Sequence, residues 1–203
     1  MGKTFDILIP ELQSWLGRQR VFFVATAPLS GEGHVNCSPK GGDTFRVLDG
    51  NRVAYLDLTG SGIETVAHVQ ENGRIVLMFC AFEGPPKIVR LHGKGEVIYP
   101  GSGEFEELMG RFPRHGAARA IVRVTVTRIS DSCGFGVPLM SFSGNRGLLD
   151  EWAERKGPRG LQRYRRDNNL RSIDGHEGYK MPDQPPDPPA AAVKPSGQQA
   201  RQP

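Results

Sequence analysis

The chain has 203 residues, of which 26 are Lys or Arg and 22 are Asp or Glu, so its formal net charge is only +4. This length is typical of a single domain with appendages, and it suffices for a buried core without disulfides or metals. The slight basic excess favours anionic partners but does not single out nucleic acid, because a phosphorylated small molecule is anionic too.

The three cysteines, Cys37, Cys80 and Cys133, lie far apart and form no C-x-x-C pair. An odd, scattered count argues against a disulfide framework and favours a reducing compartment. The N-terminal segment lacks the pattern of a secretory signal, and no apolar run approaches the ~18 residues that a membrane span needs. We therefore expect a soluble, cytoplasmic protein without a membrane partner.

Residues 5–17 carry apolar side chains at helical spacing, which predicts a short helix with Pro10 in its first turn or at a kink. Alternating or wholly apolar runs follow, and the run 74–82 is typical of a strand buried on both faces. The expected strands are 21–28, 34–39, 44–48, 52–59, 74–82, 87–99 and 119–130, and the expected helices between them are 64–72 and 103–112. Six or so strands joined by hairpin turns indicate a mainly β protein, an antiparallel barrel with short flanking helices.

The composition divides the chain into three parts. Residues 1–143 hold the predicted barrel, and 144–180 form a charged extension of two short helices split at Gly157-Pro158. Residues 181–203 are rich in Pro, Ala and Gln with almost nothing to bury, so we expect a disordered tail. The basic run in the extension favours a solvated helical face over a nucleic-acid surface, since aromatic residues hardly interrupt it.

A glycine turn between a strand and a helix is the first candidate binding segment. The strand ends at Thr59, Gly60-Ser61-Gly62 follows, and the helix contains Thr65 in its first turn. Free N–H groups at a helix start attract anions, and the three hydroxyls add donors. The alternative is an ordinary turn in which Ser61 or Gly62 caps the helix. A dinucleotide fingerprint is excluded, because Thr65 stands where its third glycine belongs.

Two further segments carry binding-site chemistry. In 34–42, Ser38 supplies a hydroxyl, Lys40 a cation and Gly41 exposed backbone, although a plain hairpin loop uses the same residues. The irregular segment 132–144, with Cys133, Gly134 and Phe135, would line a planar ligand or pack a dimer contact.

Arg90 and His92 face the same side of the long strand 87–99, either in a pocket or on a solvated face. No P-loop, nucleophile elbow or zinc motif occurs in the sequence. We therefore name no catalytic residue and expect no metal site.

Although each motif is weak alone, their order is specific. The run from FFVATAPLSGEGHVNCSPKGG through VAYLDLTGSGIETVAHVQENGRIVLMFCAF to IVRLHGKGEVI resembles the pyridoxamine 5′-phosphate oxidase-like family of flavin-binding split barrels. The resemblance covers roughly residues 15–135, and SCGFGVP and NNLRSIDG are similar to a subfamily described only as related to that oxidase. It implies a six-stranded split barrel and a homodimer with FMN at the subunit interface.

The resemblance also implies roles for the candidate residues. Ser38, Lys40 and Gly41 would border the isoalloxazine ring, and Thr59 to Gly62 with Thr65 would receive the phosphate. Arg90 would reach the phosphate or the flavin edge, and the segment Cys133, Gly134 and Phe135 would approach the flavin, from the partner chain in one arrangement.

Two departures separate this chain from the true oxidases. Their Arg-Lys pair at the phosphate helix is replaced by Ile63-Glu64-Thr65, and their C-terminal Trp and Arg pattern for pyridoxamine phosphate is absent. We therefore predict an FMN-dependent oxidoreductase acting on another small molecule. The alternatives are a flavin-binding module without turnover and a reductase that uses a deazaflavin on the same fold.

Overall fold

The structure, a computed structural model, describes residues 2–181. The predicted disordered tail therefore lies outside the described residues, apart from Met181. The strands are β1 (Thr4–Phe5), β2 (Phe22–Thr26), β3 (Asn36–Lys40), β4 (Phe45–Val47), β5 (Arg52–Leu58), β6 (Arg74–Cys80), β7 (Ile88–Ile98) and β8 (Ala118–Ser132). The helices are α1 (Pro10–Arg18), α2 (Glu64–Asn72), α3 (Gly103–Met109) and α4 (Leu148–Asn168).

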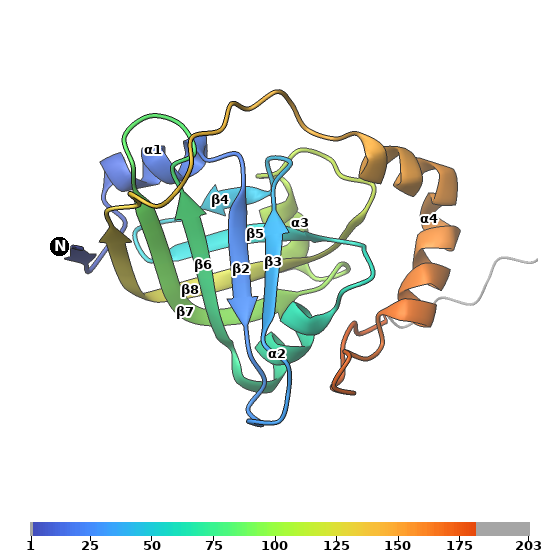
Figure 1. The fold of residues 1–203 in the computed structure, drawn as a ribbon. Helices are drawn as coiled ribbons and strands as arrows, with labels where there is room; N and C mark the ends of the chain where they lie inside the picture. Colours follow the sequence, from blue (N-terminus) through green and yellow to red (C-terminus); the bar gives the residue numbers. More distant parts are fainter. Residues whose placement is uncertain (1, 182–203) are drawn as a thin grey trace, which may run out of the picture.

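One strongly curled antiparallel sheet makes up the barrel (Figure 1). Its strands run in the order β3-β2-β6-β7-β8-β5-β4, and β1 pairs with β8. The mainly β, antiparallel split-barrel prediction is thus confirmed, but the count of six strands is wrong. The described residues contain eight. Seven of them match the expected runs, and the additional strand, β1, is only two residues long, too short for a recognisable alternation.

The two longest strands, β7 and β8, share a β-bulge between His92 and Gly93. A Cβ on Gly93 would lie 2.3 Å from the carbonyl oxygen of Thr125, so only glycine fits this close approach. The bulge lets β7 and β8 bend around the core, which is built from inward-facing apolar side chains of β2, β5, β6, β7 and β8.

The helices differ from the sequence predictions at their ends. α1 begins at Pro10 rather than at residue 5, because the fixed φ of proline suits the first helical position and Phe5 pairs in β1 instead. α2 has Ile63 as its N-cap without a side-chain bond, so the expectation of a Ser61 or Gly62 cap is wrong. The predicted break in the C-terminal helix is present, since Gly157 adopts φ +62° and kinks α4 before Pro158.

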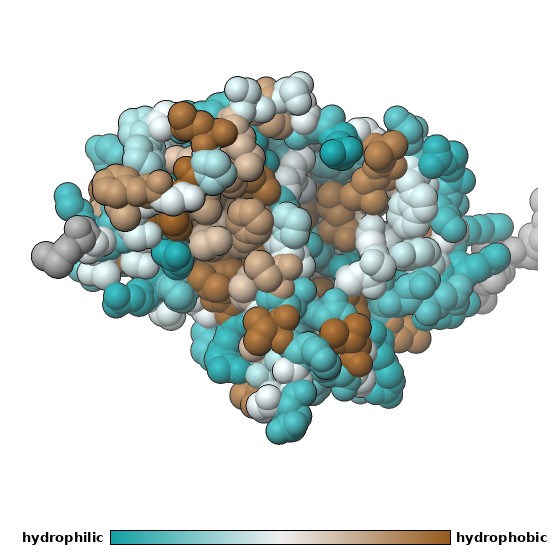
Figure 2. Space-filling model, viewed as in Figure 1, coloured by the Kyte–Doolittle hydropathy of each residue, from teal (hydrophilic) through white to brown (hydrophobic). Residues whose placement is uncertain are grey.

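The outer face of the sheet is apolar and only partly covered. In β6, Ile75, Leu77 and Phe79 are buried, but Val76 and Met78 between them are half-buried and face outward. The prediction that this strand is buried on both faces is therefore wrong for a single chain. Figure 2 shows apolar side chains gathered over β2 and β6 on this side of the molecule.

His68 gives the fold a predictable pH dependence. It is fully buried in α2, where Nδ1 lies 3.0 Å from Oγ1 of Thr26, and burial lowers its pKa together with the nearby His176. A lowered folded pKa means that the unfolded chain binds the proton first, so stability falls as pH drops below about 6.5, by up to ~1.4 kcal/mol per pH unit.

His68→Gln should flatten this part of the stability profile, because the glutamine does not titrate. Urea unfolding of both proteins between pH 7.5 and 5 checks the prediction. Parallel profiles would contradict it and assign the dependence to the neighbouring titratable groups His176, Glu71, Asp174 and Glu64.

None of the described helices is long and apolar enough to cross a membrane.

Candidate functional site

A cavity of about 620 Å³ lies between the barrel and the C-terminal extension. Its barrel wall contains Lys40 and Gly41 at the end of β3 and Thr59 and Gly60 at the end of β5. The opposite wall is formed by 144–150, the end of the strap (residues 133–147) and the start of α4. As Figure 1 shows, the strap passes over the barrel from the end of β8 to α4. Four predicted binding residues from two distant segments thus meet in one cavity.

Lys40 and the neighbouring predicted residue Ser38 lie on one face of β3. Asn36, Ser38 and Lys40 alternate on one face, since successive strand residues point to opposite sides. Asn36 donates a hydrogen bond from Nδ2 to Oγ1 of Thr65 at 2.8 Å, and Ser38 donates to Oδ1 of Asn36. Asn36 therefore joins Ser38 to the first turn of α2.

Lys40 is held by a buried ion network. Its Nζ lies 3.3 Å from Oδ1 of Asp57, and Nε of Arg119 donates to Oδ2 of the same carboxylate at 2.7 Å. Burial opposes ionisation of Asp57, but the charges and hydrogen bonds of Arg119 and Lys40 outweigh it and hold the pKa below the ordinary value. The carboxylate is therefore ionised at neutral pH, with two cations against one anion beside the cavity.

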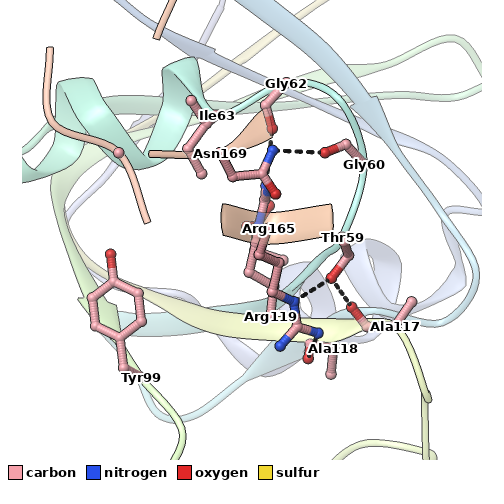
Figure 3. Close-up of polar contacts among 12 residues, drawn as sticks. Thr59, Gly60, Gly62, Ile63, Tyr99, Ala117, Ala118, Arg119, Arg165 and Asn169 are labelled. Carbon is pink, nitrogen blue, oxygen red and sulfur yellow. Dashed lines mark hydrogen bonds and ion pairs between the residues drawn. The ribbon is translucent and has the colours of Figure 1, made fainter. Parts of the chain in front are cut away.

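The glycine turn accepts hydrogen bonds from side chains of the C-terminal extension and of β8 (Figure 3). Nδ2 of Asn169 donates to the carbonyl oxygen of Gly60 at 2.9 Å, and Arg119 donates to that of Gly62 at 3.0 Å. Arg165 donates from Nε to Oγ1 of Thr59 at 2.9 Å. Positive charge thus surrounds this turn, although the turn itself contains none.

An acidic side chain also reaches the start of α2. Oε2 of Glu64 accepts a hydrogen bond from the N–H of Ile63 at 3.0 Å. A carboxylate is stabilised there by the helix dipole, as any anion would be. Glu64 therefore competes with a bound phosphate for one of the donors at this helix start.

His115 ties the far wall of the cavity together. Its Nδ1 lies 3.0 Å from Oδ1 of Asp150 at the start of α4, and its Nε2 lies 3.2 Å from the carbonyl oxygen of Gly42. Both neighbours are acceptors, so only a doubly protonated ring donates to both. This histidine links the loop after β3 to the extension that covers it.

Ser38, Ser61, Gly62 and Thr65 adjoin the cavity-lining residues in the chain but do not line the cavity themselves. The other four predicted residues form a second group, apart from this cavity within one chain. Arg90 donates to Oγ of Ser132 on the neighbouring strand β8. Gly134 packs against the backbone of Lys87, Cys133 is exposed and Phe135 is 82% exposed. None of these residues lines the cavity, so their predicted contact with the flavin requires a second chain and stays a prediction.

Comparison with known proteins decides the family. Residues 8–133 match the family described as pyridoxamine 5′-phosphate oxidase. A curated relative, the pyridoxamine 5′-phosphate oxidase family protein ustO of Aspergillus flavus, is 40% identical over 192 residues, covering 86% of this chain and 76% of the relative. The chain belongs to the pyridoxamine 5′-phosphate oxidase family.

Solved structures show weaker likenesses. A single-residue variant of HupZ from Group A Streptococcus has a TM-score of 0.48 at 23% identity, covering 62% of this chain and 99% of HupZ. A putative pyridoxamine 5′-phosphate oxidase from Lactobacillus delbrueckii has a TM-score of 0.47 at 16% identity, covering 62% and 94%. An FAD-binding protein from Mesorhizobium loti has 0.47 at 14%, covering 64% and 96%.

Sequence reasoning missed four residues around the glycine turn, namely Asp57, Arg119, Arg165 and Asn169. A signal existed for Asp57, because a carboxylate inside the apolar run 53–58 needs a buried partner. Nothing comparable marked Asn169, which stands beside the exposed Asn168 in a uniformly polar stretch.

Proposed function

We propose that this pyridoxamine 5′-phosphate oxidase family protein binds FMN in the cavity between barrel and extension, and that it is a flavin-dependent oxidoreductase acting on a small molecule. The observation that carries the proposal is the meeting of Lys40 and Gly41 with Thr59 and Gly60 in one cavity. Family membership supports it.

The residues present fit a phosphorylated flavin. A volume of about 620 Å³ lies within the ~300–1,000 Å³ typical of ligand pockets. Leu56, Leu58 and Leu149 give apolar walls for a flat ring, Lys40 gives a cation beside that ring, and Arg146 adds a second cation to the lining. Polar groups that converge on a partly apolar cavity are the usual composition of a cofactor site.

The side chains of this chain orient the cofactor and exclude water. Asp57 fixes the ammonium group of Lys40 at the cavity wall, while the strap and α4 cover the opposite side. When bound, FMN would supply the hydride chemistry itself, so no protein side chain is required as a general base.

A flavin-binding module without turnover is the second candidate. Glu64, whose carboxylate occupies one donor at the start of α2 where the family's oxidases carry cations, is expected to weaken phosphate binding under either candidate. A deazaflavin on the same fold remains the third candidate.

The absorbance spectrum of the purified protein tests the proposal. A visible flavin band, with FMN identified by mass spectrometry of the released ligand, would support FMN binding. Bleaching of that band by a reduced nicotinamide would support turnover. A colourless protein that does not take up added FMN would contradict the cofactor assignment. A bound flavin that resists reduction would favour the second candidate, a flavin-binding module without turnover.

We further propose a homodimer whose flavin contacts both chains. The outer sheet face presents half-buried Phe23, Val76 and Met78, and the strap adds Leu139, 79% exposed, and Phe142, 43% exposed. Contiguous apolar surface of this kind marks protein interfaces. A second chain on this face would cover it and bring Arg90 and the segment Cys133, Gly134 and Phe135 toward the partner's cavity.

Dilution should release FMN at the concentrations where the dimer dissociates. A cofactor that binds only the assembled state stabilises that state by mass action, so added FMN should shift the equilibrium toward the dimer. Size-exclusion chromatography with light scattering, across a dilution series with and without FMN, measures both effects.

Met78→Asp should raise the dimer dissociation constant at least tenfold. Ile7→Asp, at a 51% exposed apolar residue that lies beside the β4–β5 turn, serves as the control. A monomer that keeps stoichiometric FMN would contradict the interface arrangement.

A further inference from the structure

Asn169 is a fully buried polar residue directly after α4. Its Nδ2 donates to the carbonyl oxygen of Gly60 at 2.9 Å and approaches that of Ser61 at 3.4 Å, and its Oδ1 accepts from Arg119 at 2.9 Å. A buried amide with donors and acceptor satisfied is held in one orientation. Asn169 is therefore rigidly docked against the glycine turn, as Figure 3 shows.

The segment after Asn169 closes tightly over the same region. The N–H of Tyr179 donates to the carbonyl oxygen of Asn169 at 2.7 Å, and Tyr179 is buried. A Cβ on Gly178 would lie 2.4 Å from that carbonyl oxygen and 2.7 Å from Cγ1 of Ile63, so glycine is required for this approach. The docking is thus close-packed as well as hydrogen-bonded.

The direction of the bound carbonyls fixes the direction of the N–H groups. In a trans peptide the C=O of one residue and the N–H of the next point opposite ways, and the described chain contains no cis peptide. With the carbonyls of Gly60 and Ser61 turned to Asn169, the N–H groups of Ser61 and Gly62 point away from it. Within the described chain, neither N–H has an acceptor.

The peptide between Gly62 and Ile63 shows which kind of acceptor such an N–H binds. The carbonyl of Gly62 is bound by Arg119, and the N–H of Ile63, on the opposite side of that peptide, holds the carboxylate of Glu64. An anionic oxygen thus already lies on the side of this peptide opposite Arg119, and the other oxygen of the same carboxylate accepts from the N–H of Ile173 at 3.4 Å. Successive N–H groups on one side form a concave site for a phosphate-type anion.

We propose that Asn169 is a positioning residue, which orients the turn so that the N–H groups of Ser61 and Gly62 bind the phosphate monoester of the cofactor. This inference rests on the proposed function. It assigns to the C-terminal extension a role in phosphate recognition. The contact of Asn169 with the turn would then affect binding of the phosphate end of the ligand only. The ring end, near Lys40 and Gly41, does not depend on Asn169.

The test compares FMN with riboflavin, which carries the same ring without the phosphate. Asn169→Ala removes the donor to the turn, and Asn169→Asp removes it while keeping the size and the acceptor for Arg119. Both variants should bind FMN at least tenfold more weakly and bind riboflavin within twofold of the unmodified protein. Asn168→Ala, at the exposed neighbour, should change neither affinity. Circular dichroism and fluorescence titration of all four full-length proteins provide the data.

The outcomes separate this inference from the proposed function. Equal losses of affinity for FMN and riboflavin would show that Asn169 has a general structural role. An unchanged preference for FMN in folded variants would show that Asn169 has no role in phosphate binding. Either result overturns the positioning role. An unmodified protein that binds riboflavin as tightly as FMN overturns it too, while flavin binding stands. A protein that binds neither flavin overturns the proposed function itself.

Discussion

Replacing Asp57 by asparagine should lower the free energy of unfolding by about 3–5 kcal/mol, the usual cost of breaking a buried ion pair from one side. Asp57 and Arg119 are 1% and 3% exposed, and Lys40 shares the same carboxylate. Asparagine keeps the shape but removes the charge, which leaves the buried guanidinium without its counterion. Urea unfolding of the apoprotein, compared through the midpoint and the slope, measures the loss.

Asp43→Asn is the matched control. Asp43 also pairs with an arginine, Arg46, at 2.7 Å, but its side chain is 67% exposed. Exposed ion pairs contribute about 0–1 kcal/mol, and asparagine accepts the same left-handed backbone as aspartate. A loss at Asp57 no larger than at Asp43 would contradict the structural importance of the buried network.

The same network predicts how acid acts on the fold. Because the folded pKa of Asp57 lies below the unfolded value, its stabilisation is complete above about pH 4 and is lost as pH falls further, through the folded pKa. The Asp57→Asn variant should therefore lose less stability than the unmodified protein over that acidic range. The comparison uses the same unfolding assay below pH 4.

The turn and its helix were predictable because their signals are local. Thr59 ends an alternating strand, glycines follow, and Gly73 closes the helix with φ +71°. The loop with Lys40 was found in the same way, from a short extended run and two glycines. What brings Lys40 to Thr59 is the pairing of the strands into one curled sheet, which no single segment encodes.

The residues that hold the turn in place were not predictable from local pattern. Arg119 meets Asp57 across 62 positions, and Asn169 meets Gly60 across 109. In the sequence, Arg119 is a charged residue at the start of an alternating strand, and a solvent-facing position is the ordinary interpretation. In the docked extension Asn169 bonds to both Arg119 and Gly60, and that docking includes the close approach at Gly178.

The substitution Gly62→Asp should weaken FMN binding at least tenfold, a loss of about 1.4 kcal/mol or more in binding free energy. The added carboxylate would stand at the turn that we propose for the phosphate, next to Glu64, whose Oε2 lies 3.0 Å from where the new Cβ would be. Like charges in a partly desolvated site repel strongly. Gly62 has no left-handed backbone, so the substitution itself adds no φ strain.

Gly62→Asn separates charge from size, because asparagine imposes the same displacement of Glu64 without a second negative charge. We expect the asparagine variant to stay within about threefold of the unmodified protein, which corresponds to roughly 0.6 kcal/mol. Titration of each folded variant with FMN, followed by flavin fluorescence, gives the affinities. Equal affinities for the aspartate and asparagine variants would remove the phosphate from this turn. Riboflavin, which lacks the phosphate, should bind both variants alike, because the added charge has no like charge on that ligand to repel.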